Sequence, residues 1–440
     1  MSVVDSHDWI VRAGGPLGGR IRLPGDKSVS HRAIMLGSLA QGVTHVRGFL
    51  EGEDTLATAA AFRGMGVQIE APANSERIVH GVGLHGLAAP TKALDCGNAG
   101  TAMRLMSGIL SAQRFDSVLT GDESLRKRPM RRVVDPLTTM GARIDSEPGG
   151  LPPLHIHGGQ RLHGINYRLP VASAQVKSAL LLAGLYADGR TTVTEPHRTR
   201  DYTESMLAAF GVRIERSAAS ASLTGGAHLR ACAIDVPADF SSAAFFLVAA
   251  SVVPGSDLVL EAVGLNPRRT GLLDTLLDMG ADISVHERRL QGGEWVGDLR
   301  VRSAPLHGVR VPLARVPDMI DEFPALFVAA AVAKGETRIA GAAELRVKES
   351  DCIGVMAAGL RALGADIVET ADGAVISGRD SLSGGEVESA TDHRCAMSLA
   401  VAALRARDAV TIKAIDNVAT SFPGFEKLAI SIGIKIEISG

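Results

Sequence analysis

Apolar residues recur at helical spacing along this chain and stop at a glycine in six places. Each place reads as an apolar residue, a glycine, two further residues and an isoleucine. A helix that ends at a left-handed glycine and is followed by a strand produces this pattern. The glycines are Gly66, Gly141, Gly211, Gly280, Gly364 and Gly433. One such junction is a common accident, but six at similar spacing predict six copies of one αβ unit.

The same pattern predicts individual helices. We expect helices at Thr55–Arg63, Thr203–Phe210 and Thr270–Met279, directly before three of the glycines. The longest apolar runs, Ala243–Val253 and Phe323–Ala333, have about half of the roughly 20 residues that a membrane span needs. We therefore predict that both are buried helices.

The length of the chain predicts more than one domain. A chain of 440 residues exceeds what one hydrophobic core usually supports, so we expect two domains of three units each. The midpoint falls at Asp235–Asp239, which could form a linker. With 49 glycines and only 4% aromatic residues, the composition favours an α/β enzyme with many tight turns.

Charge and cysteine content exclude several other classes of protein. The formal net charge of −2 argues against a polybasic nucleic-acid-binding protein. The four cysteines are scattered without a C-x-x-C pair or a histidine at metal-ligand spacing, so we expect neither a disulfide framework nor a zinc site, and a reducing cytoplasm. Met1–Trp9 lacks a basic region followed by an apolar one, so no secretory signal is expected.

Helix starts in the first half carry candidate anion sites. Pro24–Ser28 precedes a helical run with Arg32 in its first turn, and Lys27, a serine hydroxyl and backbone N–H groups together suit an anion. The spacing is not that of a P-loop. The alternative is a Pro-Gly turn with a solvated lysine.

Three further segments of the first half have the same two interpretations. Cys96–Thr101 would let a ligand approach the backbone closely, or it is an ordinary N-cap loop. The basic run Arg126–Arg132 is a solvated helix start, or one of its arginines reaches a carboxylate or phosphate. Ser173–Ser178, followed by Arg198 and Arg200, could bind a phosphate, although capping explains Ser173 as well.

The second half holds the candidate carboxylates. Asp321 lies at the edge of an apolar segment, and Lys348 and Glu349 follow in a polar one. An acid placed in this way, close to cations, is suited to acid–base catalysis. The alternative is N-capping by Asp321 and surface ion pairing by the Lys348-Glu349 pair. These features predict small, multiply anionic substrates and a site between the domains, without a metal or nucleotide motif.

Eight segments, taken in order, resemble the EPSP synthase (3-phosphoshikimate 1-carboxyvinyltransferase) family of enolpyruvyl transferases over almost the whole chain. They are LPGDKSVSHRA (Leu23–Ala33), GNAGTAMR (Gly97–Arg104), KRPM (Lys127–Met130), ASAQVKSA (Ala172–Ala179), IDEFP (Ile320–Pro324), LRVKESD (Leu345–Asp351), DHRCAM (Asp392–Met397) and TSFPGF (Thr420–Phe425). Seven or more ordered motifs make the resemblance highly specific.

The resemblance implies an α/β fold of two similar domains, each built from three βαβαββ units, with the active site in the interdomain cleft. One domain is expected at residues 24–236. The other is expected at residues 1–23 plus 237–440, because the family's N-terminal strand belongs to the second domain. The implied enzyme moves the enolpyruvyl group of phosphoenolpyruvate to the 5-hydroxyl of shikimate 3-phosphate and releases phosphate, a step of aromatic amino-acid biosynthesis.

The resemblance also implies roles for individual residues. Shikimate 3-phosphate would bind to Lys27, Ser28, Arg32, Ser173, Gln175, Arg200, Asp321 and Lys348. Phosphoenolpyruvate would bind to Lys27, Gly100, Arg128, Gln175, Glu349 and Arg394. Asp321 would take the proton of the 5-hydroxyl, and Glu349 and Lys27 would act on the methylene and phosphate sides. No cofactor, metal, nucleic acid or membrane is expected as a partner, and a monomer is expected.

One departure from the family pattern concerns phosphoenolpyruvate. Cys352 stands where much of the family has an arginine that would pair with this substrate. Loss of a charge-assisted contact should cost about 1.5–3 kcal/mol, on the order of ten- to a hundredfold in affinity. We therefore expect Cys352 to raise the Michaelis constant for phosphoenolpyruvate. Glyphosate occupies the same site in this family, so partial tolerance is expected although Gly100 is the residue of sensitive members.

Two other functions remain as alternatives. The enolpyruvyl transferase that acts on UDP-N-acetylglucosamine shares the fold, but it has an asparagine after the lysine and a loop cysteine, whereas this chain has Lys27-Ser28 and no cysteine between Cys96 and Cys232. A catalytically impaired anion-binding relative is the other alternative, because Cys352 replaces an arginine.

Overall fold

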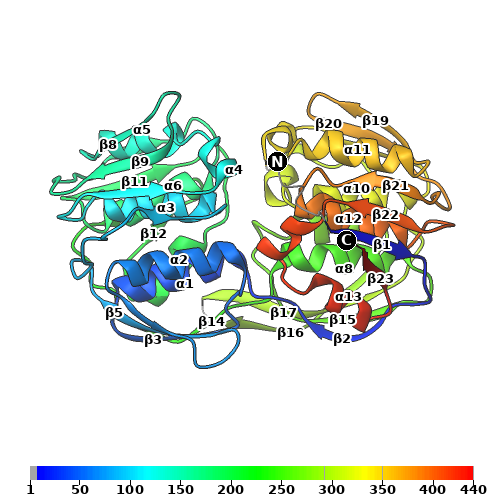
Figure 1. The fold of residues 1–440 in the computed structure, drawn as a ribbon, viewed down its shortest axis with the longest axis horizontal. Helices are drawn as coiled ribbons and strands as arrows, with labels where there is room; N and C mark the ends of the chain where they lie inside the picture. The colour runs from blue at the N-terminus through cyan, green and yellow to red at the C-terminus, as the bar shows by residue number, and fades with distance from the viewer. Residues whose placement is uncertain (1–6, 292, 349, 440) are drawn as a thin grey trace. The chain divides into compact units, whose positions relative to one another are not determined.

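The computed structural model describes residues 7–291, 293–348 and 350–439. The chain forms two compact units; in Figure 1 one is coloured blue to green, and the other green to red together with the dark blue strands at the start of the chain. The N-terminal unit contains Gly25–Pro237 and the short piece Leu290–Glu294. The C-terminal unit contains the described residues up to Pro24, Ala238–Arg289 and those from Trp295 onward.

The described part of the N-terminal unit contains three four-stranded sheets of one topology. In spatial order they are β14 (Ile234–Asp235), β3 (Gln41–Arg47), β5 (Glu76–Val82) and β4 (Gln68–Glu70); β6 (Leu94–Asp95), β7 (Ser117–Thr120), β9 (Leu151–His157) and β8 (Arg143–Glu147); and β10 (Asn166–Arg168), β11 (Arg190–Thr194), β13 (Ser220–Thr224) and β12 (Glu215–Arg216). In each sheet the first pair of strands is parallel and the next two pairs are antiparallel. The unit is therefore a threefold repeat.

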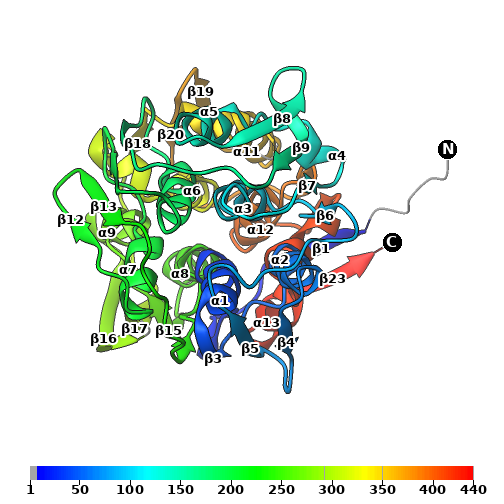
Figure 2. The same cartoon turned by 90° about the vertical axis from the view of Figure 1, so that its left-hand side faces the viewer.

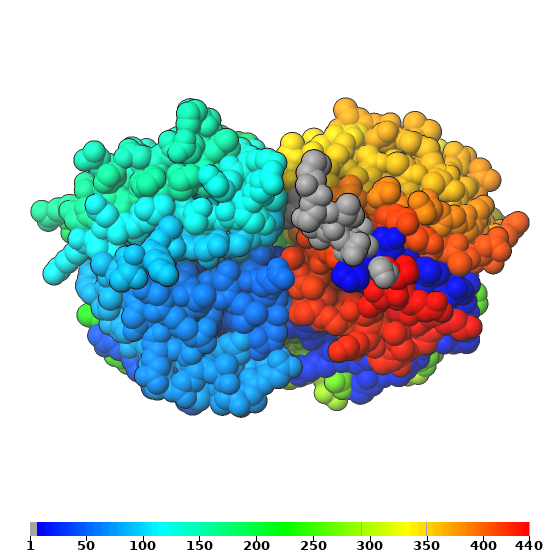
Figure 3. Space-filling view, in the orientation of Figure 1, coloured from blue at the N-terminus to red at the C-terminus, as the bar shows by residue number. Residues whose placement is uncertain are grey.

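The C-terminal unit repeats this topology among its described residues, except that its middle sheet has three strands. Its sheets are β2 (Gly18–Arg22), β15 (Asp257–Gly264), β17 (Glu294–Arg302) and β16 (Asp282–Gln291); β18 (Glu336–Ile339), β20 (Gly373–Ser377) and β19 (Asp366–Thr370); and β21 (Gly385–Glu388), β22 (Val410–Lys413), β1 (Asp8–Arg12) and β23 (Lys435–Ser439). The first strands of the chain complete sheets whose other strands come much later. Figure 3 shows this N-terminal segment in blue against the C-terminal segment in red.

Helices alternate with these strands to give the order strand, helix, strand, helix, strand, strand. The helices of the N-terminal unit are α1 (Lys27–Leu39), α2 (Glu53–Gly64), α3 (Gly100–Leu110), α4 (Glu123–Arg126), α5 (Arg131–Thr139), α6 (Ala174–Gly184) and α7 (Tyr202–Ala209). Those of the C-terminal unit are α8 (Phe240–Val252), α9 (Gly271–Asp278), α10 (Phe323–Val332), α11 (Cys352–Ala362), α12 (His393–Ala403) and α13 (Phe425–Ser431), with 3₁₀ turns η1 (Leu313–Asp318), η2 (Ala343–Val347) and η3 (Asp416–Thr420). The predicted α/β fold of βαβαββ units is confirmed.

The six glycines of the repeat pattern each follow the end of a helix, and each glycine itself has the left-handed conformation. Their φ angles are 87°, 104°, 85°, 90°, 81° and 109° in chain order. Each follows an apolar C-cap residue, at the ends of α2, α5, α7, α9, α11 and α13, and a strand comes next. A residue with a Cβ is strained at such an angle, which is why glycine stands there.

Each unit has a hydrophobic core of its own. Buried apolar residues form two clusters, one drawn from each unit. In the N-terminal unit, α1, α3 and α6 pack against one another inside the surrounding sheets (Figure 2). In the C-terminal unit, α8, α10 and α12 do the same, and the helices α8 and α10 are buried as their apolar runs predicted. The starts of these core helices carry most of the candidate site residues.

Candidate active site

The start of α1 is a fixed cationic turn. Asp26 accepts a hydrogen bond from the backbone N–H of Val29 at 2.9 Å and so caps the helix. A Cβ at Gly25 would collide with the backbone carbonyl of Gly48, so only glycine fits there. Half-buried Lys27 forms an ion pair with Asp54. Lys27 is therefore held by a carboxylate of the next helix, rather than being a solvated lysine in a turn.

Arg32 is a buried cation, with an exposed fraction of 4%. Its guanidinium donates to the Thr203 hydroxyl at 2.7 Å and to the Ser178 hydroxyl at 2.9 Å. Burial lowers the pKa of Arg32 to about 10, and the positive charge of Arg200 contributes in the same direction. Two arginines within electrostatic reach of each other stabilise a bound anion and repel one another without it.

Two more arginines lie around Gly100, the first residue of α3, which has no side chain. A Cβ at Gly100 would lie 2.8 Å from Nη1 of Arg104 and 3.6 Å from Nη1 of Arg128. Arg128 donates to the side-chain oxygen of Asn98 at 2.7 Å. Gly100 therefore leaves space at a helix N-terminus between two guanidinium groups, which suits a small carboxylate or phosphate.

Gln175 joins this arginine pair to the start of α6. Its side-chain oxygen accepts from Arg104 at 2.8 Å, and its amide donates to Thr101 at 2.9 Å. The Ser173 hydroxyl accepts from the backbone N–H of Val176 at 3.3 Å and caps α6, which is the capping role that its position suggested. Gly100, Arg128 and Gln175 are thus brought together in the N-terminal unit, with Arg104 as the link.

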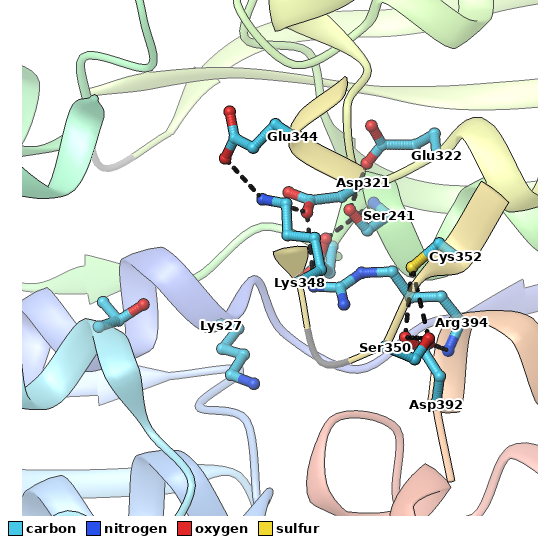
Figure 4. Close-up of polar contacts among 12 residues, drawn as sticks. Lys27, Ser241, Asp321, Glu322, Glu344, Lys348, Ser350, Cys352, Asp392 and Arg394 are labelled. Atoms are coloured by element: carbon cyan, nitrogen blue, oxygen red, sulfur yellow. Dashed lines mark hydrogen bonds and ion pairs between the residues drawn. The ribbon is translucent and has the colours of Figure 1, made fainter. Parts of the chain in front are cut away.

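In the C-terminal unit, Asp321 is surrounded by cations (Figure 4). Its carboxylate lies 3.3 Å from Nη1 of Arg269, 3.6 Å from Nζ of Lys348 and 3.4 Å from Nη2 of Arg394. Only 8% of Asp321 is exposed. Asp321 is therefore a carboxylate in a poorly solvated site, paired with three cations that could also hold an anionic substrate.

Asp321 and the next carboxylate in the chain, Glu322, have different partners. Glu322 accepts a hydrogen bond from Ser241, and it is the N-cap residue of α10 although its side chain makes no capping bond. The suggested alternative, N-capping by Asp321, is therefore wrong. Glu349 lies outside the described residues.

A second polar cluster lies where α11 and α12 begin. Cys352 donates to Oδ2 of Asp392 at 3.3 Å, and Ser350 donates to the same oxygen at 2.9 Å. Oδ1 of Asp392 caps α12 by accepting from the N–H groups of Arg394 and Cys395. Cys352 is 1% exposed. Cys352, the residue that departs from the family pattern, is therefore a buried thiol that donates to the carboxylate capping α12.

Several residues of the site escaped the sequence-based expectation. Asp54 and Asn98 hold Lys27 and Arg128, Arg104 links Gly100 to Gln175, and Arg269 faces Asp321. Arg104 follows Gly100 by four residues on one helix and so lies on the same face, a signal that could have identified it. Asp54 and Arg269 gave no such signal, because their contacts join segments far apart in sequence.

The arrangement in each unit suits anionic substrates. The N-terminal unit carries Lys27 and Arg32 in α1, Arg104 in α3, Arg128 between α4 and α5, and Arg200 before α7. The C-terminal unit offers one buried carboxylate among three cations. Among the described residues, no helix combines the length and the apolar character that crossing a bilayer requires.

Comparison with known proteins identifies the family. A model of the EPSP synthase (3-phosphoshikimate 1-carboxyvinyltransferase) family matches residues 11–428. The chain is 63% identical to the 3-phosphoshikimate 1-carboxyvinyltransferase of Xanthomonas euvesicatoria pv. vesicatoria (strain 85-10), over 99% of both chains. It is also 63% identical to that of Xanthomonas oryzae pv. oryzae (strain PXO99A), over 98% of both. The structure of EPSP synthase from Acinetobacter baumannii matches with a TM-score of 0.92 and 54% identity, over 99% of this chain and 100% of that one. The chain therefore belongs to the EPSP synthase family.

Proposed function

We propose that this chain transfers the enolpyruvyl group of phosphoenolpyruvate to the 5-hydroxyl of shikimate 3-phosphate, giving 5-enolpyruvylshikimate 3-phosphate and phosphate. Membership of the family favours this reaction over the UDP-N-acetylglucosamine alternative. The observation that carries the proposal is Asp321, a buried carboxylate among Arg269, Lys348 and Arg394. A base that must work beside anionic substrates needs this combination, because cations bind the substrate while the carboxylate receives its proton.

Shikimate 3-phosphate is proposed to bind through both units. Its phosphate would lie near Arg200, Ser28 and Ser173, and the buried charge of Arg32 supports an anion there. Ser173 can serve a ligand as well as its helix, since a hydroxyl both donates and accepts. Asp321 and Lys348, assisted by Gln175 and Lys27, would contact the hydroxyl groups of the ring.

Phosphoenolpyruvate is proposed to occupy the space beside Gly100. Arg128 and Gln175 border this space, and Arg104 lies against it. Lys27, Glu349 and Arg394 would complete the contacts. Two guanidinium groups and a helix N-terminus match a substrate that carries a carboxylate and a phosphate.

The proposed chemistry needs one base and one acid. Asp321 would accept the proton of the 5-hydroxyl as this oxygen attacks the middle carbon of phosphoenolpyruvate. Glu349 would protonate the methylene carbon, and Lys27 would stabilise the phosphate side of the tetrahedral intermediate. Loss of phosphate together with one proton of the methyl group then regenerates the vinyl double bond. Exclusion of water strengthens each of these charge interactions.

We further propose that the two compact units are the two domains of the enzyme, residues 24–236 and residues 1–23 plus 237–440, and that residues of both contact the same pair of substrates. We also propose that the enzyme works as a monomer in the cytoplasm. Four free cysteines are consistent with a reducing compartment.

The test is phosphate release by the purified protein, with shikimate 3-phosphate or phosphoenolpyruvate omitted in turn and phosphoenolpyruvate raised to high concentration. We expect release only with both substrates present, together with a product whose mass exceeds that of shikimate 3-phosphate by the enolpyruvyl group. Turnover of UDP-N-acetylglucosamine instead would contradict the proposal. Folded protein that binds shikimate 3-phosphate without any release would indicate the catalytically impaired relative.

A further inference from the structure

Two thiols and a carboxylate that the proposed reaction does not use lie together at the starts of α11 and α12. Cys352 is the first residue of α11, Asp392 caps α12, and Cys395 is the third residue of α12. All three are buried, with exposed fractions of 1%, 1% and 0%. One potential ligand atom from each lies within 4.8 Å of the others.

The spacing of these atoms is close to that of a tetrahedral metal site. Zinc bonds of about 2.3 Å to sulfur and about 2.0–2.2 Å to oxygen place neighbouring ligand atoms roughly 3.4–3.8 Å apart. Sγ of Cys352 is already 3.3 Å from Oδ2 of Asp392. Sγ of Cys395 lies within 4.8 Å of Sγ of Cys352 and of a carboxylate oxygen of Asp392. Side-chain rotations that move the ligand atoms by up to about one ångström would bring all three around one cation.

A fourth ligand is available at the same place. The hydroxyl of Ser350 lies 2.9 Å from Oδ2 of Asp392 and 3.9 Å from Sγ of Cys352. Either this hydroxyl or a water molecule could occupy the remaining tetrahedral position.

We propose that Cys352, Asp392 and Cys395 bind one thiophilic divalent cation, Zn²⁺ or Cd²⁺. On binding, both thiol protons pass to the buffer and the two sulfurs donate lone pairs to the metal. Two thiolates and a carboxylate around a divalent cation leave one net negative charge. The positive ends of the α11 and α12 helix dipoles favour this negative charge, and Arg394, the second residue of α12, adds a positive charge.

The location of this site connects it to the proposed active site. Lys348 precedes Cys352 by four residues, Arg394 follows Asp392 by two, and both cations reach the carboxylate of Asp321. A metal that binds Cys352 and Asp392 fixes the start of α11 against the start of α12. We therefore expect bound Zn²⁺ to slow turnover, a consequence that rests on the proposed function.

The direct test counts bound metal, without reference to activity. The whole protein, reduced and freed of metal with a chelator, is dialysed against buffered Zn²⁺, and in parallel titrated with Cd²⁺ while the ultraviolet thiolate-to-metal charge-transfer band is followed. We expect one equivalent per chain in the wild type. Cys352→Ser and Cys395→Ser should each weaken binding by at least about 10- to 100-fold and reduce the charge-transfer band.

The matched control is Cys232→Ser, which alters a half-buried thiol of the N-terminal unit outside the cluster and should bind metal as the wild type does. Serine at position 352 keeps a hydroxyl that can still donate to Asp392, so this variant should fold, as circular dichroism will show. If Cys395→Ser does not fold, Cys352→Ser alone decides. Unchanged binding in Cys352→Ser, or no binding by the wild type, overturns the site.

Turnover measured at the same free Zn²⁺ tests the consequence separately. We expect at least about a tenfold loss for the wild type and for Cys232→Ser, with Cys352→Ser retaining its activity. If one equivalent of Zn²⁺ binds and turnover is unchanged, the predicted inhibition is wrong and the metal site is established. A protein that binds Zn²⁺ but never releases phosphate refutes the proposed function alone.

Discussion

At the scale of single residues, one carboxylate, that of Asp321, forms ion pairs with three cations. Asp321→Asn would remove that charge and leave Arg269, Lys348 and Arg394 facing one another. Because the amide cannot take up the hydroxyl proton, we expect kcat to fall by about 10²–10⁴-fold. Steady-state phosphate release with both substrates saturating measures this effect.

The control for that substitution is Asp318→Asn, three residues earlier. Asp318 is also poorly exposed and pairs with Arg268 at 3.1 Å. It therefore loses a comparable ion pair outside the proposed site, and kcat should stay close to the wild-type value. An equal loss in both variants would mean that ion pairing in this region, rather than proton transfer, sets the rate.

Gly100 is expected to control the space for phosphoenolpyruvate. The methyl group of Gly100→Ala would lie 2.8 Å from Arg104, so this guanidinium must move away from the space that we assign to the substrate. We expect the KM for phosphoenolpyruvate to rise by about tenfold, with little change in the affinity for shikimate 3-phosphate. Gly15→Ala, which meets nothing within 4 Å, should leave both unchanged. A rise in both constants would argue against a local effect.

A substitution at Cys352 should raise the affinity for phosphoenolpyruvate, whereas Gly100→Ala should lower it. In Cys352→Arg, the guanidinium would replace a thiol that lies 3.3 Å from the carboxylate of Asp392. We expect the KM for phosphoenolpyruvate to fall by about ten- to a hundredfold and inhibition by glyphosate to strengthen in proportion. An unchanged KM would sink this idea. Because Cys352 is buried, the free energy of unfolding should be measured alongside, to separate binding from misfolding.

At the scale of elements, Lys177 ties α6 to the segment after β11 and to α7. Its ammonium lies 2.7 Å from Glu195 and 2.8 Å from Glu204, and all three side chains are almost fully buried. Lys177→Met would leave two buried carboxylates without their counter-charge, so we expect a loss of about 3–5 kcal/mol in the free energy of unfolding. Urea denaturation measures it. Lys127→Met, which breaks the exposed pair with Glu123, should cost less than about 1 kcal/mol.

Elements that depend on local sequence were predictable, and their pairings were not. Each helix-to-strand junction needs a left-handed residue, so the six glycines report directly on backbone conformation. The strands β1 and β14 complete sheets whose other strands lie far away in the sequence. No local pattern encodes such a partner, so the resemblance to a family, and not the periodicity, suggested that the N-terminal strand belongs with the second half.

The candidate site divides in the same way. Lys27, Gly100 and Arg394 lie at helix starts, where a cation or a glycine is a local signal. The residue that holds Lys27, Asp54 of α2, depends on packing between elements. The interpretation of Asp321 as a helix cap failed because the three cations that bind it come from separate segments, which a single stretch of sequence does not reveal.

At the scale of the whole molecule, each unit has its own core, and Trp9, one of the two tryptophans of the chain, lies in the core of the C-terminal unit. Trp9 is buried in β1, where it stacks on Phe425 at 5.2 Å between ring centroids, and Trp295 lies in β17. Both positions belong to the C-terminal unit. Tryptophan fluorescence should therefore follow the unfolding of the C-terminal unit, whereas far-ultraviolet circular dichroism follows both units.

This difference between probes tests whether the two cores unfold independently. Lys177→Met weakens only the N-terminal unit, so in urea without substrates we expect an earlier transition by circular dichroism and an unchanged midpoint by fluorescence. If the two cores unfold separately, the two midpoints should differ, because two buried carboxylates without their counter-charge destabilise only the core of the N-terminal unit. If both probes shift together by the same amount, the two units unfold as one cooperative structure, and the repeat organisation does not divide the stability of the chain.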